Sequence, residues 1–301
     1  MALASLALSS AQSARTILFI GNSFTFAAGS PVHFYRAESV TDLNGEGIGG
    51  VPALFRSFTQ QAGLAYEVSL ETHPGVGLDW HLANKRDILA KRPYDVVVMH
   101  GFSTLDADKP GDPAKLVATA KTTADLLRGQ NPHVAIHLMS TWSRADQTYP
   151  ATGRWTGQPI EAMARDVRAA YDKAAANASP ITSVIPVGEA WLRAMHTGVA
   201  DPNPYDGIDA GKLDLWTYDH YHASTYGYYL EALTTFGAVT NLDPRSLTEN
   251  ECSAFELGLS SAQTKALQQV AFDELTNAKV PMTAPAQAKR PSSGSRCAAS
   301  H

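Results

Sequence analysis

The sequence predicts an α/β protein in which helices cover both faces of a five-stranded parallel sheet, giving a three-layer α/β/α sandwich. Five short runs rich in Val, Ile and Leu recur along the chain, and segments with helical spacing lie between them. Near-continuous apolar runs are typical of strands that are buried on both faces. Strands that alternate with helices favour a parallel sheet covered on both sides.

The five expected strands are short and are separated by segments long enough to hold a helix. Several are almost continuous in β-branched and aliphatic residues, so we expect both of their faces to be covered. They span residues 16–20, 66–70, 95–100, 134–139 and 183–187.

Three of the segments between these strands have the pattern of an amphipathic helix. In the first of them, apolar residues recur at i, i+3, i+4 and i+7. These residues are Val51, Leu54, Phe55 and Phe58. The segments 116–127 and 159–176 are rich in Ala, with charged residues distributed as on the exposed face of a helix. Residues 25–50 have no clear period, and a loop of that length in a compact domain usually has a function.

The composition of the chain is that of an ordinary globular protein. It has 301 residues, of which 44% are hydrophobic and 18% are charged, and we expect a single large domain over residues 15–282. The formal charge of −5 is mild and Lys and Arg are scattered, so nucleic acid is not an expected partner. No stretch approaches the roughly 18 apolar residues of a membrane-spanning helix.

The two ends of the chain differ in composition from this domain. The first residues are small and apolar, and Ser9-Ser10-Ala11 would suit a signal-peptide cleavage site, although the preceding basic region is missing. Residues 1–14 are therefore interpreted either as the remnant of a signal peptide, which implies a secreted or periplasmic protein, or as a ragged terminus. Residues 283–301 contain almost no core-forming residues and are expected to be disordered.

The chain has two cysteines, Cys252 and Cys297, near its carboxyl end. In an oxidising compartment they could form one disulfide, which would tie down the expected tail. The alternative is that both cysteines stay unpaired, and the sequence leaves the two possibilities open.

Two short motifs carry the residues of a possible reaction. Gly21-Asn22-Ser23 follows the first expected strand, at the carboxyl edge where open α/β sheets bind their ligands. Asp219 and His222 lie three positions apart near the end of the expected domain. A serine nucleophile, a base and an acid that orients the base are the groups needed for acyl transfer through a serine ester. The sequence therefore predicts Ser23, His222 and Asp219 as catalytic residues.

Each motif also has a simpler or different explanation. Gly, Asn and Ser are the usual residues of a turn after a strand. The segment Asp219-His220-Tyr221-His222 contains ligands familiar from zinc and iron sites, which would suit a metal-dependent hydrolase. However, two histidines at this spacing on a helix would point to different faces, and no second ligand motif is present. We therefore expect no metal and no cofactor.

Taken together, the two motifs resemble those of the SGNH (GDSL-like) hydrolase superfamily, and the form Gly-Asn-Ser-Phe-Thr is similar to a bacterial branch of it. The segments 74–81, 184–191 and 222–230 also resemble blocks of that branch, in the same order. The resemblance covers roughly residues 15–245. It implies a flavodoxin-like sheet with strand order 2-1-3-4-5. It also implies a serine esterase that acts on a small-molecule or carbohydrate ester and uses no cofactor.

The resemblance further implies three hydrogen-bond donors for the oxyanion of the tetrahedral intermediate. They are the backbone N–H groups of Ser23 and Gly75 and an Asn side chain after the third strand. This chain lacks that Asn. Ser103 falls on the Asn position and carries a hydroxyl donor, while His100 at the end of the strand is the alternative donor.

Three further residues are predicted to contact the substrate. Asn22 adjoins the nucleophile, His81 follows the Gly75 segment, and Trp142 comes after the fourth strand, at the edge where ligands bind. A structural histidine and a packing tryptophan are the alternatives for His81 and Trp142. Because Trp142 and the many tyrosines could stack on sugar faces, a carbohydrate deacetylase is the first hypothesis for the substrate.

Two other functions fit the same residues. An acyltransferase would resolve the acyl-enzyme with a sugar hydroxyl rather than with water. A glycan-binding module would keep the fold without catalysis. The complete set of Ser23, Asp219 and His222 favours catalysis over binding alone.

Overall fold

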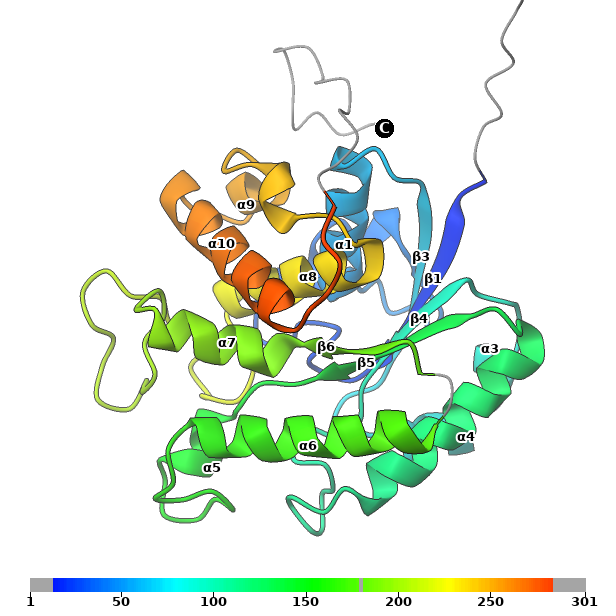
Figure 1. The fold of residues 1–301 in the computed structure, drawn as a ribbon, viewed down its shortest axis with the longest axis horizontal. Coiled ribbons are helices and arrows are strands. Elements are labelled where there is room, and N and C mark those ends of the chain that lie inside the picture. The colour runs from blue at the N-terminus through cyan, green and yellow to red at the C-terminus, as the bar shows by residue number, and fades with distance from the viewer. Residues whose placement is uncertain (1–12, 179–180, 284–301) are drawn as a thin grey trace, which may run out of the picture.

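The computed structural model describes residues 13–178 and 181–283 of the chain. This part forms three layers, with one sheet between two groups of helices (Figure 1). The expected α/β/α sandwich is therefore confirmed. Most of the expected signal segment, most of the expected tail and Cys297 lie outside the described residues, so export, disorder and disulfide formation stay predictions.

The sheet is parallel throughout and its strands have the order β2-β3-β1-β4-β5-β6. The strands are β1 (Arg15–Gly21), β2 (Thr41–Asp42), β3 (Tyr66–Thr72), β4 (Val96–Met99), β5 (Ala135–Ser140) and β6 (Ser183–Pro186). The expectation of five strands was wrong by one, because β2 pairs with β3 at the edge of the sheet. Such a short strand has no periodic pattern that a sequence could reveal. Without β2, the order is the expected flavodoxin-like one.

Helices follow most of the strands, as the sequence pattern predicts. The α-helices are α1 (Gly50–Gln61), α2 (Leu78–Asn84), α3 (Arg86–Leu89), α4 (Ala114–Gln130), α5 (Ala145–Thr148), α6 (Glu161–Asn177), α7 (Val187–His196), α8 (Thr225–Thr240), α9 (Cys252–Glu256) and α10 (Ser261–Asn277). The 3-10 helices are η1 (Pro31–Phe34), η2 (Ala37–Ser39) and η3 (Pro244–Leu247). The three helical patterns in the sequence correspond to α1, α4 and α6. Within 13–178 and 181–283, no helix has the length and apolar character needed to cross a membrane.

The two faces of the sheet are covered by different helices. Along β1, Ile17 and Phe19 belong to the cluster that contains α1, α7, α8 and α10, whereas Leu18 and Ile20 belong to the cluster that contains α4 and α6. Successive side chains of a strand point to opposite faces, so a continuous apolar strand is buried on both. Figure 1 shows the first group of helices above the sheet and α4 and α6 below it.

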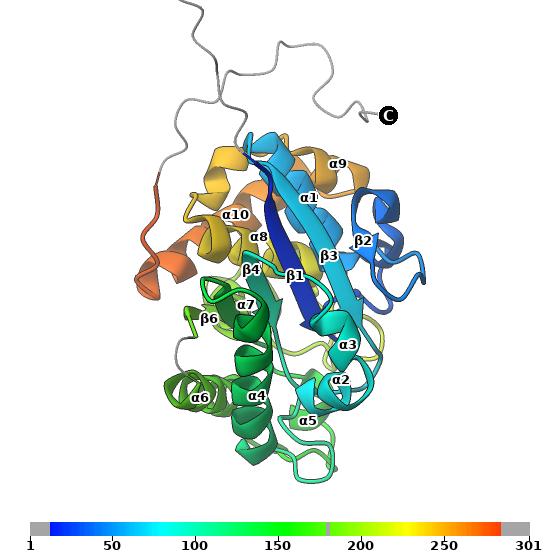
Figure 2. The same cartoon turned by 90° about the vertical axis from the view of Figure 1, so that its right-hand side faces the viewer.

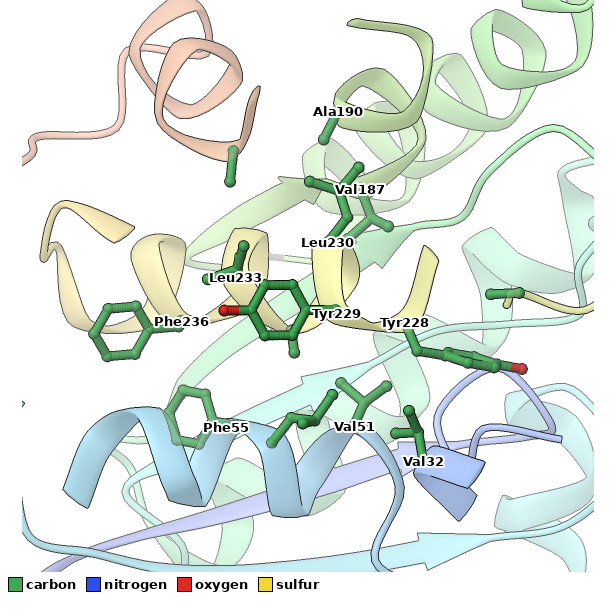
Figure 3. Packing of buried hydrophobic residues seen from close by; sticks show 14 of the residues in the cluster. Val32, Val51, Phe55, Val187, Ala190, Tyr228, Tyr229, Leu230, Leu233 and Phe236 are labelled. Atoms are coloured by element: carbon green, nitrogen blue, oxygen red, sulfur yellow. The ribbon is translucent and has the colours of Figure 1, made fainter. Parts of the chain in front are cut away.

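The helix α8 lies at the centre of the first layer. Figure 3 shows it between α1, which contributes Val51 and Phe55, and α7, which contributes Val187 and Ala190. Nearly every residue of α8 is buried, as expected for a helix that is apolar on all sides. This packing fixes the helix that directly follows the segment with Asp219 and His222.

The carboxyl ends of the parallel strands meet at one edge of the sheet, and β1 and β3 point to it side by side (Figure 2). The strand β1 lies between β3 and β4, where the order of the strands along the chain reverses. Open α/β sheets bind ligands at this switch point. The fold therefore presents the residues that follow β1 at the place where a ligand is expected.

Candidate active site

The candidate nucleophile lies in a tight turn that begins where β1 ends. The Oδ1 atom of Asn22 accepts a hydrogen bond from the N–H of Phe24 (3.1 Å), and the Asn22 carbonyl accepts one from the N–H of Thr25 (2.9 Å). Asn and Asp side chains commonly close turns in this way. Ser23 is thereby fixed at the carboxyl edge of the sheet, and it is almost completely buried.

The glycine before this turn is required by a close contact. A Cβ atom at Gly21 would clash with Thr25 Oγ1 and His100 Nε2, which are hydrogen-bonded to each other (2.8 Å). Gly21 thus lets the end of β1 approach the end of β4. The Gly in the Gly-Asn-Ser motif has a packing reason that is independent of any reaction.

The candidate base and its acid lie together in a second turn, before α8 begins. Asp219 Oδ2 lies 2.6 Å from His222 Nδ1, and Asp219 Oδ1 accepts the backbone N–H groups of Tyr221 (3.0 Å) and His222 (2.9 Å). Asp219 and His222 are thus three residues apart because the Asp219 side chain closes the turn between them. At the end of this turn, Ser224 caps α8 by accepting from the N–H of Gly227 (3.4 Å).

The Asp219 carboxylate is held in its ionised form. Partial burial by itself raises the pKa of Asp219, but hydrogen bonds from His222, Thr217 and the backbone lower it more, to about 2. A carboxylate can only accept hydrogen bonds, so the proton in its bond to His222 lies on Nδ1. The other ring nitrogen, Nε2, then has the lone pair that a general base needs.

The two turns are connected by aromatic and hydrogen-bonding contacts. The ring of Phe24, next to Ser23, packs edge-on against the ring of His222 with centroids 6.0 Å apart. The hydroxyl of Tyr228, on α8, lies 3.2 Å from the carbonyl oxygens of Ser23 and Ala28. Among the described residues, no hydrogen bond joins Ser23 Oγ to His222. In enzymes without substrate this bond is often long and shortens only in the complex.

Asn22, which was expected to contact the substrate, is used inside the protein instead. Its Nδ2 atom donates to the carbonyl oxygens of Val76 (2.8 Å) and Gly101 (3.3 Å). It therefore holds the turn that contains Gly75 and the loop after β4 next to the nucleophile. Gly75 itself is exposed and has a φ of +67°, a conformation that favours glycine.

The two candidates for the third oxyanion donor differ in how their side chains are used. His100 Nδ1 lies 2.9 Å from the carbonyl oxygen of Gly101, and Nε2 is bonded to Thr25. Burial lowers the pKa of His100 to about 4, so the ring is neutral at pH 7 and both of its nitrogens are occupied. Ser103 is also buried, and its Oγ accepts a hydrogen bond from Arg144 Nη1 (3.0 Å). A hydroxyl that accepts a bond still has its own proton to donate, so we retain Ser103 as the proposed donor.

Two residues expected to contact the substrate are buried inside the protein. His81 is almost fully buried and is paired with the buried carboxylate of Glu71. Trp142 is 0% exposed and is stacked between Phe24 (3.8 Å between ring centroids) and Trp191 (4.7 Å). Neither side chain can present a face to a bound sugar. Their roles are the alternatives considered from the sequence, a structural histidine and a packing tryptophan.

The two histidines of the Asp219–His222 segment point to different partners. His222 is paired with Asp219, whereas the ring of His220 lies against Tyr205, with centroids 4.3 Å apart. Within residues 13–178 and 181–283, no group of three or more His, Cys, Asp and Glu side chains is placed to hold a metal ion. The arrangement thus places an acid beside a histidine, next to the turn that holds Ser23.

Sequence reasoning missed three side chains that shape this site. They are Arg144, which bonds to Ser103, Tyr228, which holds the nucleophile turn, and Tyr171, whose hydroxyl accepts the N–H of Gly101 (2.8 Å). Arg144 lies shortly after the fourth expected strand, at the edge of the sheet where ligands bind. This position is the one feature of the sequence that could have indicated its role. Tyr171 and Tyr228 lie in the helices α6 and α8, and nothing in the sequence pattern of either segment indicates a contact with the site.

No family model matches the chain, and no curated protein matches it in sequence. Solved structures do resemble it. A DUF4886 family protein from Bacteroides uniformis ATCC 8492 is 19% identical with a TM-score of 0.63, and the match covers 90% of this chain and 98% of that one. A candidate GDSL-like lipase from Parabacteroides merdae ATCC 43184 is 17% identical with a TM-score of 0.53, and the match covers 75% of this chain and 95% of that one. A candidate SGNH hydrolase from Slackia heliotrinireducens is 20% identical with a TM-score of 0.50, and the match covers 74% of this chain and 98% of that one.

These similarities are similarities of fold. Together with the parallel sheet and its strand order, they show that the chain has the fold of the SGNH (GDSL-like) hydrolases. The SGNH fold that the motifs implied is thereby confirmed.

Proposed function

We propose that this protein is a serine esterase of the SGNH superfamily, with Ser23 as nucleophile, His222 as base and Asp219 as the acid that orients the base. The observation that carries the proposal is the 2.6 Å contact between Asp219 Oδ2 and His222 Nδ1, beside the turn that holds Ser23. The fold supports it, because this turn lies at the switch point of the sheet. The likeness to solved SGNH-type structures supports the class of reaction.

The proposed reaction uses side chains and backbone groups of this chain alone. Ser23 Oγ attacks the ester carbonyl carbon while His222 Nε2 takes the hydroxyl proton. The resulting oxyanion accepts hydrogen bonds from the backbone N–H groups of Ser23 and Gly75 and from the Ser103 hydroxyl. His222 then gives its proton to the leaving alkoxide, and the alcohol departs from an acyl-Ser23 intermediate.

The second half of the reaction repeats these steps with water as nucleophile. His222 Nε2 takes a proton from the water while its oxygen attacks the acyl carbon. The tetrahedral intermediate collapses, His222 returns the proton to Ser23 Oγ, and the carboxylic acid leaves. Asp219 stays ionised throughout and stabilises the imidazolium form of His222 in both halves. If a sugar hydroxyl takes the place of water, the same residues catalyse acyl transfer.

For the substrate we propose an O-acetyl group on a carbohydrate. Trp142 no longer supports this assignment, because its ring is buried. Two tyrosines do support it. Tyr218 is 87% exposed and directly precedes Asp219, and Tyr205 is 46% exposed and lies against His220. Exposed aromatic rings at the edge of a site combine an apolar face with a polar hydroxyl, which suits a sugar ring.

Labelling with a fluorophosphonate tests the proposed nucleophile directly. We expect one adduct on wild-type protein, located at Ser23 by intact mass and peptide mapping. The adduct is lost in Ser23→Ala and nearly lost in His222→Ala, because the serine is unreactive without its base. Ser246→Ala, which removes a serine of η3, serves as the matched control and should label like wild type. A folded wild-type protein that forms no adduct would exclude the serine-esterase mechanism.

A further inference from the structure

Arg144 is a partly buried arginine in the short connection between β5 and α5. Its side chain is only 12% exposed. Nε and Nη2 form two parallel bonds to the Asp146 carboxylate (3.0 and 2.6 Å), and Nη1 donates to Ser103 Oγ (3.0 Å). The guanidinium also lies over the ring of Tyr221, 3.5 Å from its centroid. Arg144 thus connects the loop after β4, the loop after β5 and the turn that holds the base.

The paired bonds to Asp146 fix the plane and the direction of the guanidinium. Two parallel N–H···O bonds leave little rotational freedom, which is why arginine is used where a planar group must be held in place. Asp146 is itself attached to the second turn, since its backbone N–H donates to the carbonyl of His220 (3.2 Å). The Arg144 guanidinium, which donates the third bond to Ser103, is therefore held in place through Asp146 by the turn that contains Asp219 and His222.

This bond determines how the Ser103 hydroxyl can be used. A guanidinium has no lone pair to offer, so Ser103 Oγ must be the acceptor and its own proton points elsewhere. In the described part of the chain, Ser103 Oγ makes no other hydrogen bond. A cation on the oxygen also withdraws electron density from the O–H bond, which makes the hydroxyl a stronger donor.

We propose that Arg144 is a positioning residue that turns Ser103 into the third oxyanion donor. The inference rests on the proposed esterase function and explains how this chain manages without the Asn found at that position in the superfamily. An amide side chain presents its N–H in a fixed plane, whereas a serine hydroxyl rotates freely. The bond from Arg144 restricts that rotation before the substrate arrives, because the O–H can no longer point toward the guanidinium, and preorganised donors stabilise an oxyanion most effectively.

A double-mutant cycle tests this assignment with 4-nitrophenyl acetate as the ester. Loss of one oxyanion donor lowers kcat by about 10²–10³ fold in enzymes of this type, and we expect Ser103→Ala to approach this loss. Arg144→Met should lower kcat by about tenfold or more with KM nearly unchanged, because the donor is needed only in the transition state. The double variant should be no slower than Ser103→Ala, since Arg144 acts through Ser103.

Two results would overturn the assignment while leaving the esterase intact. One is an Arg144→Met variant as fast as wild type. The other is a pair of effects that multiply in the double variant, which would mean that Arg144 acts through Tyr221 and the base instead. A wild-type protein that neither hydrolyses the ester nor labels at Ser23 would overturn both the inference and the proposed function.

Two further variants keep the test valid if Arg144→Met does not fold. Arg144→Lys keeps the charge, but a single ammonium group cannot hold the Asp146 carboxylate in a fork and also reach Ser103. It should remain folded by circular dichroism and still lose kcat. Ser103→Asn in the Arg144→Lys background supplies an amide donor that needs no positioning, and it should recover part of the lost kcat. A fully active Arg144→Lys variant, or no recovery, would contradict the inference.

Discussion

At the scale of single residues, the Asp219 carboxylate accepts four hydrogen bonds in the candidate site. One carboxylate oxygen closes the turn by accepting two backbone N–H groups and the Thr217 hydroxyl (2.7 Å), and the other accepts from His222. The same bonds that shape the turn thus lower the pKa of Asp219 to about 2. The turn and the orientation of the base depend on one ionised group.

Replacement of Asp219 by Asn should separate these two roles. An amide at this position can still accept the backbone N–H groups, but its NH₂ cannot accept a proton from His222 Nδ1. If the NH₂ faces the ring, the proton moves to Nε2 and the base is lost. We expect kcat for 4-nitrophenyl acetate to fall by about 10³–10⁴ fold, the scale known for this change in serine hydrolases.

The matched control for this prediction is Asp243→Asn. Like Asp219, Asp243 accepts a hydrogen bond from a backbone N–H group and is paired with a neighbouring side chain, in both cases of Arg245. It is the N-cap of η3 and lies outside the candidate site. It should leave kcat unchanged. A folded Asp219→Asn variant within tenfold of wild type would contradict the role given to the acid.

Sequence reasoning proposed the three candidate catalytic residues because their chemistry and spacing are local properties. Ser23 follows a strand, and Asp219 and His222 lie within one turn. The substrate-contact predictions for Trp142 and His81 were unsupported by the structure, because burial depends on side chains from distant segments. Trp142 is covered by Phe24 on one side and by Trp191 on the other. No pattern within the segment around Trp142 contains that information.

At the scale of elements, the start of α8 connects the base to the core. Gly227 lies in the first turn of this helix, where a Cβ atom would clash with the Leu215 carbonyl oxygen and the Trp191 ring. The absence of a side chain at Gly227 therefore lets α8 lie closer to the segment before it than a larger residue at this position would allow. This approach sets the distance between α8 and the turn that holds His222.

Gly227→Ala should destabilise the protein even though alanine favours helices. Relief of the clash requires a backbone shift, and overpacking of this kind costs about 1–3 kcal/mol of unfolding free energy. Gly129→Ala is the matched control, because a Cβ atom at Gly129, also in a helix, would have no atom within 4 Å. Alanine there should stabilise by about 0.5–1 kcal/mol. Urea denaturation compares the two variants, and equal effects would contradict the packing argument.

The elements themselves were predictable where the pattern was long. The five longer strands are apolar runs in the sequence, and the helices α1, α4 and α6 have a helical pattern. By contrast, β2 has two residues and α5 has four, too few for any period to be recognised. These short elements form because the surrounding loops place them, and α5 is one of the elements that brings Arg144 into the site.

At the scale of the whole molecule, buried neutral histidines make stability depend on pH. Burial lowers the pKa of His100 and of His137 to about 4, compared with 6.5 for an ordinary histidine. Between these two pH values the unfolded chain binds protons that the folded chain does not. The contribution of these two histidines to the free energy of unfolding therefore decreases as the pH falls from about 6.5 to about 4.

Urea denaturation of the wild type and of a histidine variant at pH 7 and pH 5 isolates this contribution, because the opposing contribution of the buried Glu231, whose pKa is raised by burial, is common to both proteins. Each of the two histidines contributes about 2 kcal/mol to the difference between the two pH values. His100→Gln removes the titrating group. The difference in its free energy of unfolding between pH 7 and pH 5 should therefore be about 2 kcal/mol smaller than that of the wild type, whatever the absolute stability of the variant. His133→Gln, at an exposed position, is the control and should keep the wild-type difference. An unchanged difference in His100→Gln would show that His100 is not buried in its neutral form.

The wide separation of the two turns along the chain has a consequence for synthesis. Ser23 and the tyrosine that holds its carbonyl are 205 positions apart. A chain leaving the ribosome amino terminus first contains the serine turn long before Asp219, His222 and α8 exist. Until then the serine is an ordinary alcohol, because nothing takes its proton. On the proposed mechanism, the catalytic centre therefore arises only once nearly all of the domain has been made, and a chain released early would carry an unactivated hydroxyl group.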